Sequence, residues 1–193
     1  MEHLSKEFWS QKYTESQTGW DLGAVSPPIK AYFDQFEDKS VSILIPGCGN
    51  GHEAEYLFNQ GFTNVHVIDL AEEPLNNLKN RVEGFPSSQI HQGDFFEHEG
   101  TYNFIVEQTM FCAIDPVLRA NYAATAHRLL ESSGKIVGLL FNTNFESGPP
   151  YGGSKDEYES VFGEHFSKIT MEDCYNSIEP RLGSEFFIKI QKD

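Results

Sequence analysis

Basic residues and long apolar runs are both scarce in this sequence. It has 14 Lys and Arg against 29 Asp and Glu, which gives a formal net charge of −15 over 193 residues. Because so negative a surface repels phosphate backbones, we expect no nucleic-acid partner. No segment approaches the roughly twenty apolar residues of a membrane-spanning helix. The polar start, residues 1–7, has neither the basic beginning nor the apolar centre of a signal peptide. We therefore expect no membrane association.

Cysteine is also scarce. The three cysteines, Cys48, Cys112 and Cys174, are widely spaced and form no C-x-x-C pair. An odd number of dispersed cysteines is typical of reduced thiols, so we expect a cytoplasmic protein. The 7 histidines are scattered, and His52-Glu53 is not extended to the H-E-x-x-H pattern. We therefore predict no metal site.

Internal repeats, low-complexity tracts and linkers are absent as well. With 193 residues, of which 39% are hydrophobic, the chain has the size of one domain with a sizeable core. We predict a single domain over residues 1–193, in which residues 1–40 form N-terminal helices and residues 41–193 an α/β core. We expect a monomer.

Strands and helices are predicted to alternate after the N-terminal segment. Helices are expected over 5–16, 28–36, 51–59, 72–82, 116–130 and 155–161, and strands over 41–45, 65–69, 88–91, 102–107, 135–141, 166–171 and 185–191. Residues 132–134 are predicted to form a turn, and Gly61 to end the helix before it. Such alternation favours a parallel sheet with helices on both faces. The last two strands suggest an antiparallel edge hairpin.

A glycine-rich turn follows the first strand. Residues 45–51 read I-P-G-C-G-N-G, and glycines at Gly47, Gly49 and Gly51 allow a backbone to approach a ligand closely. Asp69, twenty residues after Gly49, closes the next strand. A carboxylate in that position can accept hydrogen bonds from both ribose hydroxyls. The pattern predicts a site for a nucleoside-type cofactor.

The turn lacks the third glycine of G-x-G-x-x-G, which pyrophosphate binding requires. S-adenosylmethionine has a ribose, an adenine and a cationic sulfonium but no phosphate. Asp94 and Phe95, in G-D-F-F after the third strand, provide a carboxylate for the adenine amine and an aromatic face for the ring. Singly, each feature also fits a tight turn or a helix cap. Together they predict S-adenosylmethionine as the cofactor and S-adenosylhomocysteine as its product.

Three other functions fit parts of this pattern. An NAD-dependent oxidoreductase is disfavoured by the glycine spacing and by the lack of an evident proton donor. A protein that binds the cofactor without catalysis stays open. Residues 148–151, G-P-P-Y, are similar to the Asp/Asn-Pro-Pro-Tyr motif of amino methyltransferases. They begin with Gly and follow the fifth strand instead of the fourth, which disfavours that activity.

Five segments together resemble one family. They are 19–23 (G-W-D-L-G), 45–51 (I-P-G-C-G-N-G), 93–96 (G-D-F-F), 111–116 (F-C-A-I-D-P) with Arg119 behind it, and 148–151 (G-P-P-Y). In this order they resemble the thiopurine S-methyltransferase family, and within it the plant and bacterial halide/thiol methyltransferases. The F-C-A-I and G-P-P-Y runs discriminate best.

The resemblance implies a Rossmann-like, seven-stranded class I methyltransferase sheet with an N-terminal helical lid over the cofactor. It places cofactor contacts on Trp9, Tyr13, Trp20, Gly47, Asp69, Asp94, Phe95 and Gln108. The thiol enzymes carry Trp where Tyr13 stands, Tyr where Gln108 stands and Asp where Glu107 stands.

The implied reaction moves the methyl group to a small soft nucleophile: a thiol, hydrosulfide, thiocyanate or halide. Thiopurines and other aromatic thiols are the second candidate acceptors. Such nucleophiles require no strong general base, and a dry pocket that aligns donor and acceptor accelerates the displacement. We expect Arg119 to face the substrate and attract the anion, or else to pair with Asp115. Tyr151 is expected to orient the nucleophile, or else to be an ordinary turn residue.

Overall fold

The computed structural model describes residues 5–193, so residues 1–4 of the predicted N-terminal segment lie outside the described part. The strands are β1 (Ile43–Pro46), β2 (Val65–Asp69), β3 (Ile90–Gln92), β4 (Tyr102–Gln108), β5 (Leu130–Phe141), β6 (Lys168–Asp173) and β7 (Glu185–Gln191). The α-helices are α1 (Lys6–Thr14), α2 (Pro27–Phe33), α3 (His52–Asn59), α4 (Glu72–Arg81), α5 (Arg119–Leu129) and α6 (Lys155–Gly163).

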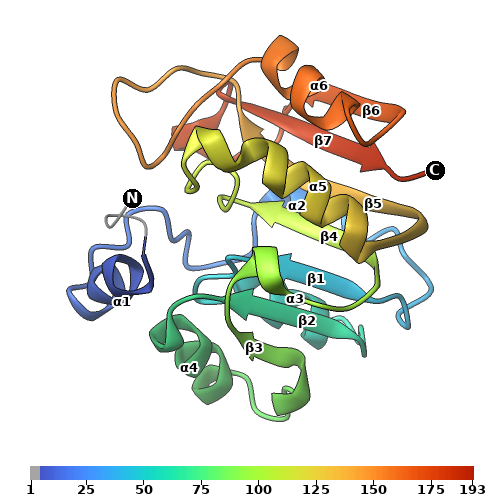
Figure 1. The fold of residues 1–193 in the computed structure, drawn as a ribbon. Helices are drawn as coiled ribbons and strands as arrows, with labels where there is room; N and C mark the ends of the chain where they lie inside the picture. The colour runs from blue at the N-terminus through green and yellow to red at the C-terminus, as the bar shows by residue number, and fades with distance from the viewer. Residues whose placement is uncertain (1–4) are drawn as a thin grey trace.

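All seven strands form one sheet in the order β3-β2-β1-β4-β5-β7-β6 (Figure 1). The neighbours from β3 to β5 pair in parallel. β7 is antiparallel to both β5 and β6. The predicted parallel sheet with an antiparallel edge pair is therefore confirmed.

Alternating side chains of the central strands build one core on each face of the sheet. Leu44 and Ile68 belong to the core covered by α5 and α6. Ile45 and Val67, their neighbours in sequence, belong to the core covered by α2, α3 and α4. Because successive strand residues point to opposite faces, a strand buried on both sides is a continuous apolar run. This explains why β1 and β2 are readable from sequence alone.

The prediction of a turn over 132–134 is wrong. The extended strand β5 begins at Leu130, which pairs with Tyr102, and regular pairing resumes where Lys135 meets Phe104. The intervening residues form a bulge in which Ser133 has a left-handed φ of 64°. Strand β3 is also shorter than predicted, since a 3₁₀ turn occupies Ser87–Gln89.

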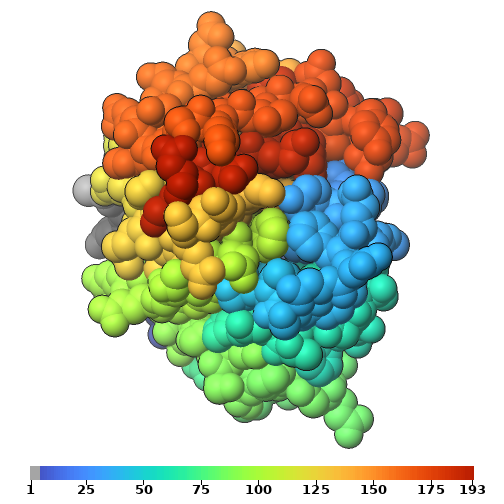
Figure 2. Space-filling model, turned by 90° about the vertical axis from the view of Figure 1, so that its right-hand side faces the viewer, coloured from blue at the N-terminus to red at the C-terminus, as the bar shows by residue number. Residues whose placement is uncertain are grey.

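The carboxyl ends of the parallel strands meet at one edge of the sheet, and α1 stands in front of that edge (Figure 1). Figure 2 shows the opposite edge, where the red C-terminal residues, the yellow start of β5 and the blue segment before β1 lie side by side. Among residues 5–193, no helix is long and apolar enough to cross a membrane. Loops at the first edge, between α1 and the sheet, are where ligands of open α/β sheets bind.

Candidate active site

The glycine turn after β1 has the geometry that only glycine adopts readily. Gly47, Gly49 and Gly51 have φ values of 56°, 52° and 70°. A Cβ on Gly49 would lie 2.9 Å from the hydroxyl oxygen of Tyr13 on α1. A Cβ on Gly51 would meet Leu78 at the same distance, so that glycine serves helix packing. The turn therefore brings a bare backbone against the N-terminal helix.

We expect Gly49→Ala to reduce affinity for S-adenosylhomocysteine about tenfold, because its methyl group displaces Tyr13. Gly61→Ala is the matched control: Gly61 has a φ of 89°, and no atom lies within 4 Å of its Cβ position. Both variants should lose about 1 kcal/mol of stability from left-handed strain. Calorimetry and urea unfolding separate the two effects, and equal affinities in the two variants would contradict this role of Gly49.

Asp69, at the end of β2, lies beside this turn. One carboxylate oxygen accepts the Gly49 N–H at 3.0 Å and the other accepts the Ala71 N–H at 2.9 Å. Each oxygen keeps capacity for a further hydrogen bond. Burial raises the pKa of the Asp69 carboxyl to about 6, although both N–H donors oppose that shift. A polar ligand that donates to Asp69 would find a fixed, largely desolvated acceptor.

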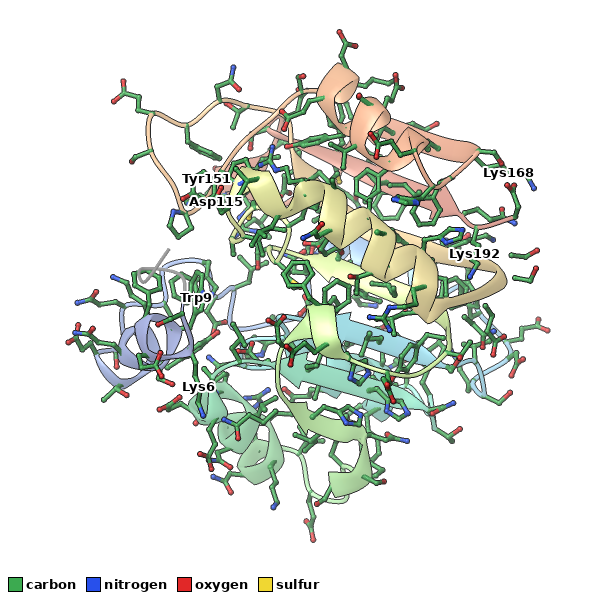
Figure 3. The ribbon with its side chains drawn as sticks, in the orientation of Figure 1. Lys6, Trp9, Asp115, Tyr151, Lys168 and Lys192 are labelled. Atoms are coloured by element: carbon green, nitrogen blue, oxygen red, sulfur yellow. The ribbon has the colours of Figure 1, made fainter. Side chains whose placement is uncertain are left out.

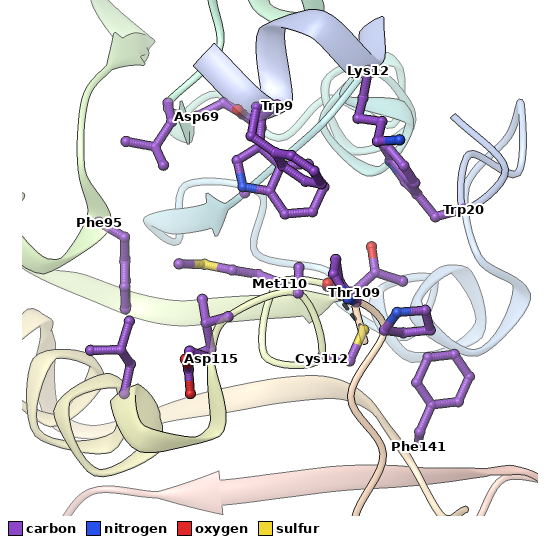
Figure 4. A pocket seen from close by; sticks show the side chains of 18 of the residues that line it. Trp9, Lys12, Trp20, Asp69, Phe95, Thr109, Met110, Cys112, Asp115 and Phe141 are labelled. Atoms are coloured by element: carbon purple, nitrogen blue, oxygen red, sulfur yellow. Dashed lines mark hydrogen bonds between the residues drawn. The ribbon is translucent and has the colours of Figure 1, made fainter. Parts of the chain in front are cut away.

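A cavity of about 1170 Å³ lies between α1 and the carboxyl ends of the strands (Figure 4). Among the predicted site residues it is lined by Trp9, Tyr13, Trp20, Gly47, Asp69, Asp94 and Phe95. The structure thus brings together residues from α1, the glycine turn and the ends of β2 and β3. Asp94 also caps a 3₁₀ turn, since its carboxylate accepts the Phe96 N–H at 2.9 Å. Its two roles are compatible because one oxygen is sufficient for the cap.

Aromatic rings form the N-terminal wall of the cavity. The ring of Trp20 packs edge-on against Trp9 at 5.6 Å and against Tyr13 at 5.9 Å between centroids. The loop carrying Trp20 is fixed by Asp21, whose carboxylate pairs with His52 at 2.8 Å and accepts from Asn50 of the glycine turn. Such edge-to-face contacts favour a rigid apolar wall. Figure 3 places Trp9 on the same side of the molecule as Asp115 and Tyr151.

Gln108 lies behind the large cavity. It lines an adjoining cavity of about 40 Å³, together with Gly49, Asp21 and the backbone of the glycine turn. Both polar atoms of its side-chain amide are buried and have no hydrogen-bond partner among residues 5–193. Buried polar atoms are rarely left unpaired. An amide with a free donor and a free acceptor fits the amino and carboxylate groups of an amino-acid ligand.

The other end of the large cavity is mostly apolar. Its walls are Thr109, Met110, Cys112, Phe141, Thr143, Phe145, Pro149, Pro150, Pro180, Arg181 and Ser184. Arg181 was not found from the sequence. It is the last residue of the 3₁₀ turn Glu179–Arg181 before β7, and it donates to the carbonyl oxygen of Trp20 at 3.0 Å. Its Nη1 lies 3.5 Å from the Glu185 carboxylate. Arg181 therefore supplies a cation to this end of the cavity.

Arg119 and Tyr151 are not among the residues that line the cavity. Only 3% of Arg119 is exposed. Its guanidinium pairs with Glu157 of α6 instead of Asp115, and donates to the carbonyl oxygen of Gly152 at 2.9 Å. The Tyr151 N–H donates to the Cys112 carbonyl at 2.6 Å. In this structure Arg119 and Tyr151 hold the 148–153 loop from behind the cavity wall.

Structures with this sheet order and a nucleoside-type site at its carboxyl edge are class I methyltransferases, which use S-adenosylmethionine, and the chain has their fold. Residues 4–186 match the model of the thiopurine S-methyltransferase family, and the chain belongs to that family. The resemblance predicted from five sequence segments is confirmed.

Named relatives cover most of the chain. A probable thiol methyltransferase 2 of Arabidopsis thaliana is 28% identical over 96% of this chain and 84% of its own length. Thiocyanate methyltransferase 1 of Brassica oleracea is 27% identical over 92% and 81%. A thiopurine S-methyltransferase of Vibrio campbellii is 26% identical over 81% of each chain.

Solved structures show the same fold. A Burkholderia thailandensis 1,6-didemethyltoxoflavin-N1-methyltransferase with bound S-adenosylhomocysteine superposes with a TM-score of 0.73, at 17% identity over 97% of this chain and 86% of that one. A structure from work on conversion of a disulfide bond into a thioacetal during echinomycin biosynthesis reaches 0.77, at 16% identity over 97% and 92%. At these identities the likeness establishes the fold.

Proposed function

We propose that this methyltransferase uses S-adenosylmethionine to methylate a small soft nucleophile: a thiol, hydrosulfide, thiocyanate or halide. The observation that carries the proposal is one continuous cavity with a nucleoside-type end at Asp69 and Asp94 and an apolar end that contains Arg181. The thiol and thiocyanate methyltransferases among the relatives support this acceptor class.

The residues present fit the cofactor. The unpartnered amide of Gln108 and the bare turn at Gly47 and Gly49 suit an amino-acid group, while Asp69 suits the ribose and Asp94 with Phe95 the adenine. When bound, S-adenosylmethionine supplies an electrophilic methyl group on a positively charged sulfur. The acidic side chains Asp69, Asp94 and Asp115 on the cavity wall favour a cationic ligand.

The chain's own residues then act on the acceptor without a general base. Trp9, Trp20 and Phe141 exclude water, and the loss of hydration strengthens the nucleophilicity of a soft anion. Arg181 attracts that anion and lowers its free energy in an apolar site. Burial raises the pKa of the Cys112 thiol, which makes it an apolar wall residue instead of a base.

Thiopurines and other aromatic thiols are the second candidate acceptors, and the wall composition supports them. Phe141 and Phe145 pack edge-on with 5.1 Å between centroids, next to Pro149 and Pro150 on the cavity wall. Flat apolar surfaces of this kind favour an aromatic ring. The thiopurine S-methyltransferases among the relatives support the same alternative.

Two measurements test the proposal. Calorimetry with S-adenosylhomocysteine should show binding, and absence of binding up to about millimolar ligand contradicts the cofactor assignment. A headspace assay with hydrosulfide, iodide and thiocyanate, run beside thiophenol and thiopurine assays, should show transfer to the small anions. Transfer confined to thiopurines would favour the second candidate.

We further propose a single domain over residues 1–193 that acts as a monomer in the cytoplasm, with α1 and the loop after it as a lid over the cofactor. The contacts of Tyr13 with the glycine turn and of Trp20 with Arg181 support the lid. Light scattering coupled to size exclusion tests the monomer. A second mass that grows with protein concentration would contradict it.

A further inference from the structure

Glu107 is a buried carboxylate near the end of β4, and only 1% of it is exposed. One carboxylate oxygen accepts the backbone N–H of Phe111 at 2.8 Å. The other accepts the hydroxyl of Tyr122 on α5 at 2.5 Å. Neither contact is an ion pair. A buried carboxylate without a cationic partner costs folding free energy, and these two donors compensate for part of that cost.

The segment that Glu107 holds is the turn between β4 and the F-C-A-I run. Thr109 stands in this turn with a left-handed φ of 67°, an uncommon conformation for a β-branched residue. Thr109, Met110 and Cys112 all line the acceptor end of the cavity. A Cβ on Gly47 would touch the Met110 side chain at 2.9 Å, so the turn also packs against the glycine turn. The carboxylate thus fixes a wall of the acceptor end where that wall packs against the glycine turn.

Tyr122 connects this wall to α5. It is fully buried, and its ring packs edge-on against Phe111 with 5.1 Å between centroids. The guanidinium carbon of Arg119 lies 5.0 Å from the centroid of the same Phe111 ring. Phe111 is therefore held at its backbone by Glu107 and at its ring by Tyr122 and Arg119. The wall cannot shift without breaking one of these contacts.

We propose that Glu107, held by Tyr122, is a positioning residue that sets the Thr109–Cys112 wall for the methyl acceptor and acts only as a carboxylate. The role as a positioning residue for the acceptor rests on the proposed function. Because both partners of Glu107 donate, a protonated carboxyl would lose one of its two hydrogen bonds.

The surroundings of Glu107 place this change near neutral pH. The titratable groups against it are Tyr122 of α5 and Cys112 of the turn, and burial raises the pKa of both. Burial also raises the pKa of the Glu107 carboxyl to about 7, against the opposing hydrogen bonds from Tyr122 and the turn backbone. Acceptor turnover should therefore decline as the pH falls through this range.

Glu107→Gln and Tyr122→Phe test the proposal, with Glu131→Gln as the control. Glu131 is an exposed carboxylate that accepts from Asn103 at 2.7 Å. It lies at the amino end of β5, away from the cavity. At about pH 8 we expect Glu107→Gln and Tyr122→Phe to lower kcat/KM for the acceptor about tenfold or more. The dissociation constant for S-adenosylhomocysteine should change less than about twofold. With iodide, which does not titrate, as the acceptor and with saturating cofactor, Glu107→Gln should also abolish the decline of kcat/KM on the acid side of neutrality.

Unfolding gives a readout that needs no activity. Because the folded pKa of Glu107 is raised, its contribution to stability is present below the unfolded pKa of about 4.5 and is lost as the pH rises through about 7. The unfolding free energy of the wild type, measured with urea, should therefore fall over that pH range relative to that of Glu107→Gln.

The outcomes separate the two proposals. With iodide as the acceptor and saturating cofactor, an acid limb of kcat/KM that persists in Glu107→Gln would overturn the role of Glu107. Equal losses of cofactor affinity and kcat/KM would do the same. Wild-type protein that binds S-adenosylhomocysteine but methylates no acceptor would overturn the proposed function instead. In that case identical pH trends of the unfolding free energy in the wild type and Glu107→Gln would still contradict the claim that Glu107 titrates near neutral pH.

Discussion

Asp69→Asn is expected to weaken binding of S-adenosylhomocysteine by about tenfold to a hundredfold, or roughly 1–3 kcal/mol. Both carboxylate oxygens already accept a backbone N–H, from Gly49 and Ala71. An asparagine of the same size can accept from one of these donors, but its NH₂ group faces the other. The variant therefore loses an acceptor for the ribose and disturbs the glycine turn at the same time.

Calorimetry measures the affinity, and Asp38→Asn is the control. Asp38 also accepts a backbone N–H from the residue two positions ahead, Ser40 at 2.9 Å, but it is exposed and does not line the cavity. That variant should bind S-adenosylhomocysteine as the wild type does. Unchanged affinity in Asp69→Asn would contradict the assignment of Asp69 to the ribose.

The pH dependence of the wild type adds a second readout of the same carboxylate, with two opposite trends. Burial raises the pKa of Asp69 from 3.8 to about 6. Its contribution to folding stability is therefore present below the unfolded pKa and lost as the pH rises through about 6. Cofactor affinity should change in the other direction, because the ionised form is the better acceptor. Both trends should disappear in Asp69→Asn.

Much of the fold could be predicted because the pattern of burial is local. Strand β2 was predicted with its observed bounds, Val65–Asp69, since an apolar run bounded by turn residues specifies a strand buried on both faces. The bulge over 131–134 could not be predicted. Its serines and glycine are typical of a turn, and only the pairing of Leu130 with Tyr102 makes the segment part of β5.

The cofactor end of the site was also predictable, because a glycine turn and an acid at a strand end are short-range signals. The acceptor end was not, because its geometry depends on contacts between distant segments. Arg181 meets the carbonyl of Trp20, which lies 161 positions away in the sequence. Arg119 instead pairs with Glu157, 38 positions away, and no spacing rule on α5 indicates that partner. The nearby Asp115 was the obvious candidate, but its carboxylate caps the turn at Val117.

Substitutions of the two arginines are expected to affect stability and acceptor turnover differently. Arg119→Met removes a buried guanidinium that donates to Gly152 and stacks on Phe111 and Tyr158. It should cost about 2–4 kcal/mol of unfolding free energy, because the partly buried carbonyl oxygens of the 148–153 loop lose their donor. Glu157 is 41% exposed and can turn toward water, which limits the loss. Urea unfolding measures this cost.

Arg181→Met should lower kcat/KM for iodide or hydrosulfide about thirtyfold or more, because the anion loses its cation in an apolar site. It should also lower the unfolding free energy, because Glu185, only 4% exposed, loses the guanidinium 3.5 Å from its carboxylate. Arg181→Lys keeps the charge and should recover part of that loss. Affinity for S-adenosylhomocysteine serves as the reference for both variants. A contrary result would assign the anion to Arg119: Arg119→Met lowers acceptor turnover without a loss of stability, whereas Arg181→Met leaves acceptor turnover unchanged. That result would also require Arg119 to leave Glu157 when the acceptor binds, because the guanidinium cannot reach the cavity while it holds the 148–153 loop.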